Sequence, residues 1–151
     1  MGRTLGLDVG TKTIGVAVSD ELGWTAQGLS TLSRRGMAAD LDALRRLVAE
    51  WEVERIVIGL PKNMNGTLGP QAVSVLEFAE AVKAALGLPV VTWDERLSTV
   101  AANRALLEGD VSRRKRKAVV DTVAAALILQ GYLDRQASIR ASRQRPADEP
   151  D

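Results

Sequence analysis

The chain has 151 residues, of which 46% are hydrophobic and 26% are charged, a balance typical of one globular domain. It contains no cysteine and no histidine, which excludes disulfides, zinc–thiolate sites, thiol catalysis, and histidine as general base or metal ligand. Hydrolysis would have to use carboxylates, lysines, hydroxyls or oxygen-bound Mg²⁺ or Mn²⁺. The net charge is only +1, so overall charge does not indicate a nucleic-acid-binding protein. No apolar stretch approaches the ~20 residues of a membrane span, and no signal-peptide pattern follows Met1. We therefore expect a cytoplasmic protein without a membrane segment.

The first third of the chain predicts strands. Residues 5–9 and 14–18 both alternate between apolar and small or polar side chains, and the turn-like segment 10–13 between them predicts a hairpin. Residues 25–31 indicate a weaker third strand. One face of the hairpin carries only small side chains beside Asp8, which would let another element approach the backbone closely: Gly6, Gly15 and Ala17.

Helices and strands alternate in the middle of the chain. Helical spacing of apolar residues predicts helices over 41–51 and 72–87, with Asp40 on the polar side of the first. Short apolar runs at 56–59 and 89–93 are typical of buried parallel strands. The segment from Pro61 to Pro70, rich in proline, glycine and asparagine, predicts a loop.

Two helices complete the predicted order, a short one over 98–107 and a last one over 113–133, separated by a break at 109–110. Three strands followed by alternating helices and strands predict an α/β fold with a mixed sheet and helices on its faces. We expect one domain over residues 1–135. The polar, proline-containing segment 136–151 is interpreted as a disordered tail.

Asp8 is the first candidate for chemistry. It stands at the end of a predicted strand and is followed by Gly10, so its carboxylate would project into a crevice beside backbone amides that can approach a phosphate. The alternative is that Asp8 only caps the turn.

Asp94 and Glu95 are the second candidates. They follow the strand over 89–93, and the carboxyl ends of parallel strands are where α/β sheets bind ligands. Because successive strand residues point to opposite faces, only one of the two can face a given site. The alternative is that one of them pairs with Arg96 or caps the following helix.

Asp121 is the third candidate. It shares a helix face with apolar residues at intervals of three and four, the last of them Leu129, and this face should pack on the sheet. An aspartate on such a face is costly unless it is paired, hydrogen-bonded or metal-bound. Carboxylates that converge on two divalent cations can hydrolyse a phosphodiester without any histidine.

Basic residues indicate a polyanionic partner. Lys12 and the loop residues Lys62 and Asn63 are expected next to the site, where they could hold phosphates, or could simply be solvated. Five cations at the start of the last helix oppose its dipole, which nucleic-acid binding would explain: Arg113, Arg114, Lys115, Arg116 and Lys117. A charged surface turn is the alternative.

Four segments resemble the YqgF family, also called RuvX, whose members are described as Holliday junction resolvases related to RuvC. They are LGLDVGTKTIGVAVSD, VIGLPKNMNG, TWDERLSTVAA and KAVVDTVAAALILQGYL, in the family's order and spanning residues 5–133. The resemblance implies an RNase H-like fold, with a five-stranded mixed sheet flanked by helices on both faces. It also implies that Asp8, Glu95 and Asp121 are catalytic, metal-binding acids. Arg96, beside Glu95, is a further candidate for nucleic-acid binding.

The resemblance further implies an endonuclease that uses Mg²⁺ or Mn²⁺ and cleaves branched DNA, or the 5′ end of the 16S ribosomal RNA precursor. Junction cleavage needs two sites, so it would favour a homodimer. Two alternatives remain at this stage. One is a nucleic-acid-binding module without catalysis. The other is an actin-like phosphate-loop ATPase, against which the length of 151 residues without a repeat argues.

Overall fold

The structure, a computed structural model, describes residues 2–97 and 113–143, and over 113–121 it describes the course of the helix without its side chains. The predicted short helix over 98–107 lies outside the described residues. The elements, in chain order, are β1 (Arg3–Val9), β2 (Thr13–Ser19), β3 (Ala26–Ser33), α1 (Met37–Trp51), β4 (Val53–Leu60), α2 (Pro70–Leu86), β5 (Val90–Asp94), the 3₁₀ turn η1 (Glu95–Leu97) and α4 (Arg113–Arg143).

The five strands form one mixed sheet in the order β3-β2-β1-β4-β5. β1, β2 and β3 pair antiparallel, whereas β4 pairs parallel with both β1 and β5. The hairpin predicted from the alternating pattern is confirmed, and its turn closes through a hydrogen bond from the Gly10 N–H to the Thr13 carbonyl at 2.8 Å. The β1–β4–β5 arrangement places the carboxyl ends of three parallel strands at one edge, where the site residues were expected.

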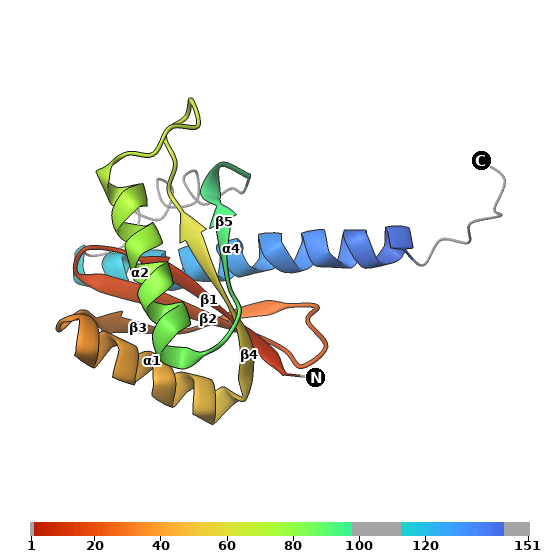
Figure 1. Cartoon of the computed structure of the whole chain (residues 1–151), viewed down its shortest axis with the longest axis horizontal. Coiled ribbons are helices and arrows are strands. Elements are labelled where there is room, and N and C mark those ends of the chain that lie inside the picture. Colours follow the sequence, from red (N-terminus) through yellow and green to blue (C-terminus); the bar gives the residue numbers. More distant parts are fainter. Residues whose placement is uncertain (1, 98–112, 144–151) are drawn as a thin grey trace, which may run out of the picture.

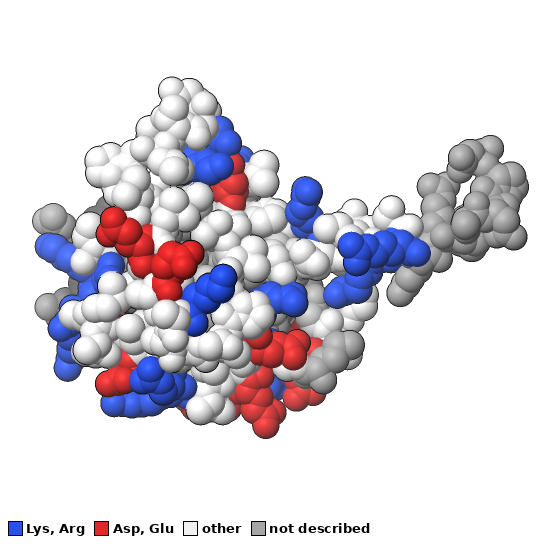
Figure 2. All heavy atoms as spheres, in the orientation of Figure 1, with Lys and Arg blue, Asp and Glu red and all other residues white. Residues whose placement is uncertain are grey.

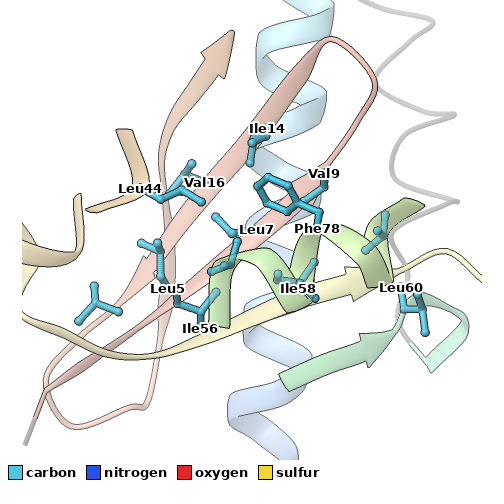
Figure 3. Close-up of a cluster of buried hydrophobic side chains, with 14 of the residues drawn as sticks. Leu5, Leu7, Val9, Ile14, Val16, Leu44, Ile56, Ile58, Leu60 and Phe78 are labelled. Atoms are coloured by element: carbon cyan, nitrogen blue, oxygen red, sulfur yellow. The ribbon is translucent and has the colours of Figure 1, made fainter. Parts of the chain in front are cut away.

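Helices cover both faces of the sheet, as predicted. α1 and α2 pack on one face and α4 crosses the other, so the sheet is the middle layer (Figure 1). The α1–α2 face has the larger core, in which Phe78 of α2 lies beside Leu7, Val9 and Ile14 of the hairpin (Figure 3). Burial of each such side chain contributes roughly 1.5–3 kcal/mol, which makes this layer the main source of stability.

The opposite face has a smaller core because its strand residues are small. Gly6 of β1 and Gly59 of β4 let α4 lie almost on the backbone, and a Cβ atom on Gly6 would stand 2.7 Å from the Cβ of Leu129. Ala125, Ile128 and Leu129 of α4 are buried there. The small-residue face seen in the sequence therefore receives a helix.

α4 is longer than the sequence predicted. It continues to Arg143, past the boundary expected at residue 135, and projects beyond the sheet (Figure 1). The expectation of disorder from Gln136 is therefore wrong for residues 136–143, which hold no proline or glycine and can continue the helix. Arg140 lies 5.6 Å from the ring centre of Trp24, and basic side chains line this projection (Figure 2). Residues 144–151 lie outside the described part.

Across the described ranges 2–97 and 113–143, no helix combines the length and the hydropathy that crossing a membrane requires.

Candidate active site

Asp8 lies on the face of the sheet that α4 covers. Strand side chains alternate, so Leu7 and Val9 enter the α1–α2 core while Gly6 and Asp8 share the other face. Asp8 is only 9% exposed. A carboxylate so buried is costly without compensating interactions, and Asp8 does interact with its surroundings. The β1 strand thus holds this acid in a fixed position under α4.

Glu95 reaches the same face from the end of β5. It opens η1 directly after the strand, and its carboxylate lies over the bare backbone of Gly59 in β4. A Cβ atom at Gly59 would stand 2.9 Å from Glu95 Oε2 and would collide with Ile128 of α4. The glycine therefore leaves the room that Glu95 occupies.

Asp94 points elsewhere. Its carboxylate accepts hydrogen bonds from Arg96 Nη2 at 2.7 Å and from the Arg96 backbone N–H at 3.0 Å. The Arg96 hydrogen bond holds the pKa of Asp94 below its usual range. The sequence left open which of the two neighbouring acids faces the site and which pairs with arginine, and the structure separates them: Asp94 pairs and Glu95 lies beneath α4.

Asp121 occupies α4 one turn before Ala125. Gly6 is two residues before Asp8 on the same strand. A Cβ atom on Gly6 would stand 3.2 Å from the Ala125 carbonyl, so this turn of α4 lies directly on β1. The next helix residue, Thr122, has its Oγ1 3.1 Å from Thr31 Oγ1. Thr31 pairs with Gly15, and Gly15 pairs with Asp8, so this part of α4 crosses the strand row that contains Asp8. The helix backbone at 121 thus passes over the strand row of Asp8, and Asp121 remains a predicted ligand.

The acids suit a hard divalent cation, which takes oxygen ligands. Asp8 and Glu95 share one sheet face at the carboxyl ends of the parallel strands, and the Glu95 carboxylate lies against the bare backbone of Gly59. Among the side chains the structure describes, no three acids, cysteines or histidines form a group that could hold a metal ion, and the third predicted ligand, Asp121, is outside that set. Asp8 and Glu95 therefore lie on one sheet face, and with Asp121 they remain the predicted metal ligands.

Arg34 is a residue the sequence analysis missed. It follows β3, and its Nη1 donates to the Gly10 carbonyl at 2.9 Å, in the turn after Asp8. Its Nε donates to Asp40 Oδ2 at 3.1 Å. Asp40, expected on the polar side of α1, is in fact 4% exposed, because it faces this arginine. Arg34 and Asp40 are near each other in the chain, but the contacts of Arg34 with the Gly10 carbonyl and the Phe78 ring join distant elements, and no local pattern reveals them.

The predicted nucleic-acid-binding residues differ in whether their side chains are exposed or already bonded to other residues. Lys12 is exposed at the tip of the β1–β2 turn, and Lys62 lies near enough to Asp94 to help lower its pKa. Asn63 instead organises its own loop, donating to Thr67 Oγ1 at 2.9 Å. Arg96 pairs with Asp94. The side chains of 113–117 are outside the described set, although α4 does begin at Arg113.

Comparison with solved structures shows the fold. Thermus thermophilus RuvC in complex with a Holliday junction substrate superposes with a TM-score of 0.57 at 14% identity, covering 91% of this chain and 97% of that one. The yeast mitochondrial Holliday junction resolvase superposes with a TM-score of 0.54 at 15% identity, covering 94% and 82%. This likeness confirms the RNase H-like α/β fold predicted from the sequence motifs.

Relatives with much higher identity carry the name "Putative pre-16S rRNA nuclease". One from Moorella thermoacetica is 65% identical over 133 residues, 88% of this chain and 95% of that protein. One from Heliobacterium modesticaldum is 59% identical over 142 residues, 94% and 95% of the two chains. The RuvX family, described as Holliday junction resolvase, matches residues 2–135. The protein therefore belongs to the RuvX family, a family of nucleases.

Proposed function

We propose that this protein is a metal-dependent endonuclease that hydrolyses phosphodiester bonds in structured nucleic acid, with Asp8, Glu95 and Asp121 as its acids. The observation that carries the proposal is the convergence of Asp8 and Glu95 on one sheet face beneath α4, from the ends of different strands. Burying a carboxylate is costly, so two acids far apart in the sequence on one covered sheet face favour a functional role. Family membership supports the nuclease over the binding module and the ATPase.

Mg²⁺ or Mn²⁺ fits this donor set, and when bound it would supply an activated water and stabilise the leaving oxygen. The three acids would hold the metal as ionised carboxylates, since the chain has no histidine to share that role. Lys12 and the basic residues 113–117 would bind phosphates on either side of the bond to be cut. Burial of Asp8 keeps its carboxylate aimed, because a buried strand residue has little rotamer freedom.

For the substrate we infer the precursor of 16S ribosomal RNA, for which the relatives are named. A four-way DNA junction is the second candidate, favoured by the description of the family. A cytoplasmic location, which the sequence predicts, would give the enzyme access to both. Symmetric junction cleavage needs two active sites, so the two candidates differ in whether a homodimer is required. Sedimentation of the active protein separates them.

The experiment that tests the proposed function incubates the purified chain with Mn²⁺ or Mg²⁺ and labelled substrates: a 16S precursor RNA, a four-way junction, a duplex and single-stranded DNA. We expect cleavage of a structured substrate that disappears in excess EDTA and returns with metal. Asp8→Asn, Glu95→Gln and Asp121→Asn should each abolish cleavage and leave binding nearly unchanged, because they remove charge while keeping shape.

Two exposed acids away from the site provide matched controls. Asp42→Asn on α1 and Glu54→Gln at the far end of β4 make the same chemical changes and should cut at the wild-type rate. Full activity in excess chelator would contradict the metal-dependent reaction. A site variant that cuts like its control would remove that acid from the site.

A further inference from the structure

We propose that Arg34 is a positioning residue for this cleavage: from the opposite face of the sheet, it holds the β1–β2 turn, and through the turn it holds Asp8. The inference rests on the proposed function, since it assigns Arg34 a role only if Asp8 binds the metal. Nothing in the sequence motifs involves Arg34, and its side chain bonds to the turn that follows the acid. Its effect would be transmitted by the backbone between Asp8 and Thr13.

The turn is tied to Arg34 by two hydrogen bonds. Arg34 Nη1 donates to the Gly10 carbonyl at 2.9 Å, and the Arg34 backbone N–H donates to the Lys12 carbonyl at 2.8 Å. These carbonyls are two and four residues after Asp8. Together with the Gly10-to-Thr13 hydrogen bond, they fix the path of the chain from the candidate metal ligand to β2.

Arg34 is itself immobilised by two helices. Asp40 of α1, 4% exposed, accepts from Arg34 Nε with Oδ2 at 3.1 Å and from the Arg35 backbone N–H with Oδ1 at 2.9 Å. The guanidinium carbon lies 4.9 Å from the ring centre of buried Phe78 in α2. The Arg34 side chain is thus held between the Asp40 carboxylate of α1 and the Phe78 ring of α2. Because Arg34 cannot move freely, its hydrogen bond restrains the β1–β2 turn.

An arginine is needed for this arrangement because its planar fork directs separate N–H groups at separate acceptors. Nε faces Asp40 while Nη1 faces Gly10, and a lysine ammonium on a flexible stem could not hold both in the same geometry. Residues that support a metal ligand from outside its coordination shell typically change metal affinity or activity by about 10–100-fold when replaced. We expect Arg34 to act in this range.

Arg3 provides a matched control for a purely structural arginine. It lies at the other end of β1 and makes the same three kinds of contact: an ion pair with Glu21 at 3.5 Å, a hydrogen bond to the Trp51 carbonyl at 3.3 Å and a stacking contact 5.7 Å from the Trp51 ring centre. Its replacement should disturb packing at the edge of the sheet away from the acids. A difference in activity or Mn²⁺ response between the Arg34 and Arg3 variants would therefore come from the position of Arg34 beside the turn after Asp8.

The experiment compares Arg34→Gln and Arg34→Lys with Arg3→Gln and Arg3→Lys in the full chain. Cleavage gives kcat, KM and the half-saturating Mn²⁺ concentration, and thermal melts without substrate give Tm with and without Mn²⁺. For the Arg34 variants we expect kcat to fall and half-saturating Mn²⁺ to rise, each by about 10–100-fold, with little change in KM. The rise in Tm that Mn²⁺ produces should shrink, because ligand-induced stabilisation falls with affinity.

The Arg3 variants should keep the wild-type kcat and Mn²⁺ response, even where their metal-free Tm falls as far. Equal losses in the Arg3 and Arg34 series, or a wild-type Mn²⁺ response in the Arg34 variants, would overturn the proposal. If Arg34→Gln does not fold, Arg34→Lys decides, since it keeps the charge beside Asp40. Failure of the proposed function is distinguishable: Asp8→Asn would then cut like the wild type, whatever the Arg34 variants do.

Discussion

At the scale of single residues, the site depends on the absence of a side chain at Gly59 as well as on the acids themselves. Gly59 sits in β4 between the carboxylate of Glu95 and the side chain of Ile128. A methyl group there would enter space that both already occupy. The same bare backbone therefore lets α4 pack closely and lets an acid from β5 lie beneath it, which couples the packing of the helix to the geometry of the site.

Replacing Gly59 with alanine should harm stability and cleavage for two separable reasons. Overpacking against Ile128 should lower the free energy of unfolding by about 1–3 kcal/mol. Displacement of Glu95 should lower kcat and weaken Mn²⁺ binding. Denaturant unfolding and Mn²⁺ titration of cleavage measure the two effects.

The double variant Gly59→Ala/Ile128→Val separates these effects, because it removes the methyl group on the α4 side and leaves the contact with Glu95. Stability should recover in part while kcat stays low. If cleavage recovers together with stability, the methyl group does not displace Glu95. The proposed link between Gly59 and the position of Glu95 would then be wrong.

At the scale of elements, the loop between β4 and α2 is held at the edge of the sheet by Arg96. This side chain pairs with Asp94 and donates from Nη1 to the Met64 carbonyl at 3.2 Å. It also packs under Gly66, whose φ of 88° suits a residue without a side chain. The loop carries Lys62 and projects beyond the sheet near the end of β5 (Figure 1). Arg96 thus orders a loop that could contact nucleic acid.

Arg96→Ala should free the loop without unfolding the domain. The pair is partly exposed, so the free energy of unfolding should change little. Amide exchange should accelerate at Asn63 and Gly66, whose N–H groups donate within the loop. Arg45→Ala, which breaks an exposed pair with Asp42 on α1, is the control and should leave these amides unchanged. Unchanged amide exchange in Arg96→Ala would show that hydrogen bonds within the loop are enough to order it.

At the scale of the whole molecule, the charge is nearly balanced while the basic residues are not evenly placed. The net charge is +1, yet α4 begins with five consecutive basic residues and ends with Arg140 and Arg143. This helix also covers the face that carries Asp8. A polyanion bound along its first turns would therefore lie close to the acids, which a calculation of overall charge would not reveal.

Neutralising Arg113, Arg114 and Lys115 to alanine should weaken binding of the cleaved substrate and flatten its salt dependence. Each lost phosphate contact should reduce the slope of log K against log salt by about 0.9 on duplex DNA. The control neutralises three exposed cations on the α1–α2 side, Arg45, Arg46 and Lys83, for the same change in net charge. Equal slopes in both triple variants would mean that overall charge, not the position of the run, controls binding.

Much of the fold could be predicted from the sequence because local periodicity reports local structure. Alternation over 5–9 and 14–18 predicted the β1–β2 hairpin, and the small residues on one face predicted the close approach that α4 makes. Gly87, with a φ of 66°, ends α2 where the pattern stopped. The end of α4 was missed because polarity was taken for disorder, whereas residues 136–143 are polar and helical.

The candidate acids were also visible in the sequence, since a carboxylate at a strand end or on an apolar helix face conflicts with its surroundings wherever it occurs. Tertiary structure alone decided what each polar group meets. It turned Asp94 to Arg96, laid Glu95 over Gly59, and buried Asp40 against Arg34. Asp94 and Arg96, and likewise Arg34 and Asp40, are close in the chain, but several residues could have been their partners, and only the packing of distant elements selected among these. Periodicity carries no information about that selection. The sequence by itself therefore determined which residues could do chemistry, and the packing of α4, α1 and α2 on the sheet decided which of them face one another.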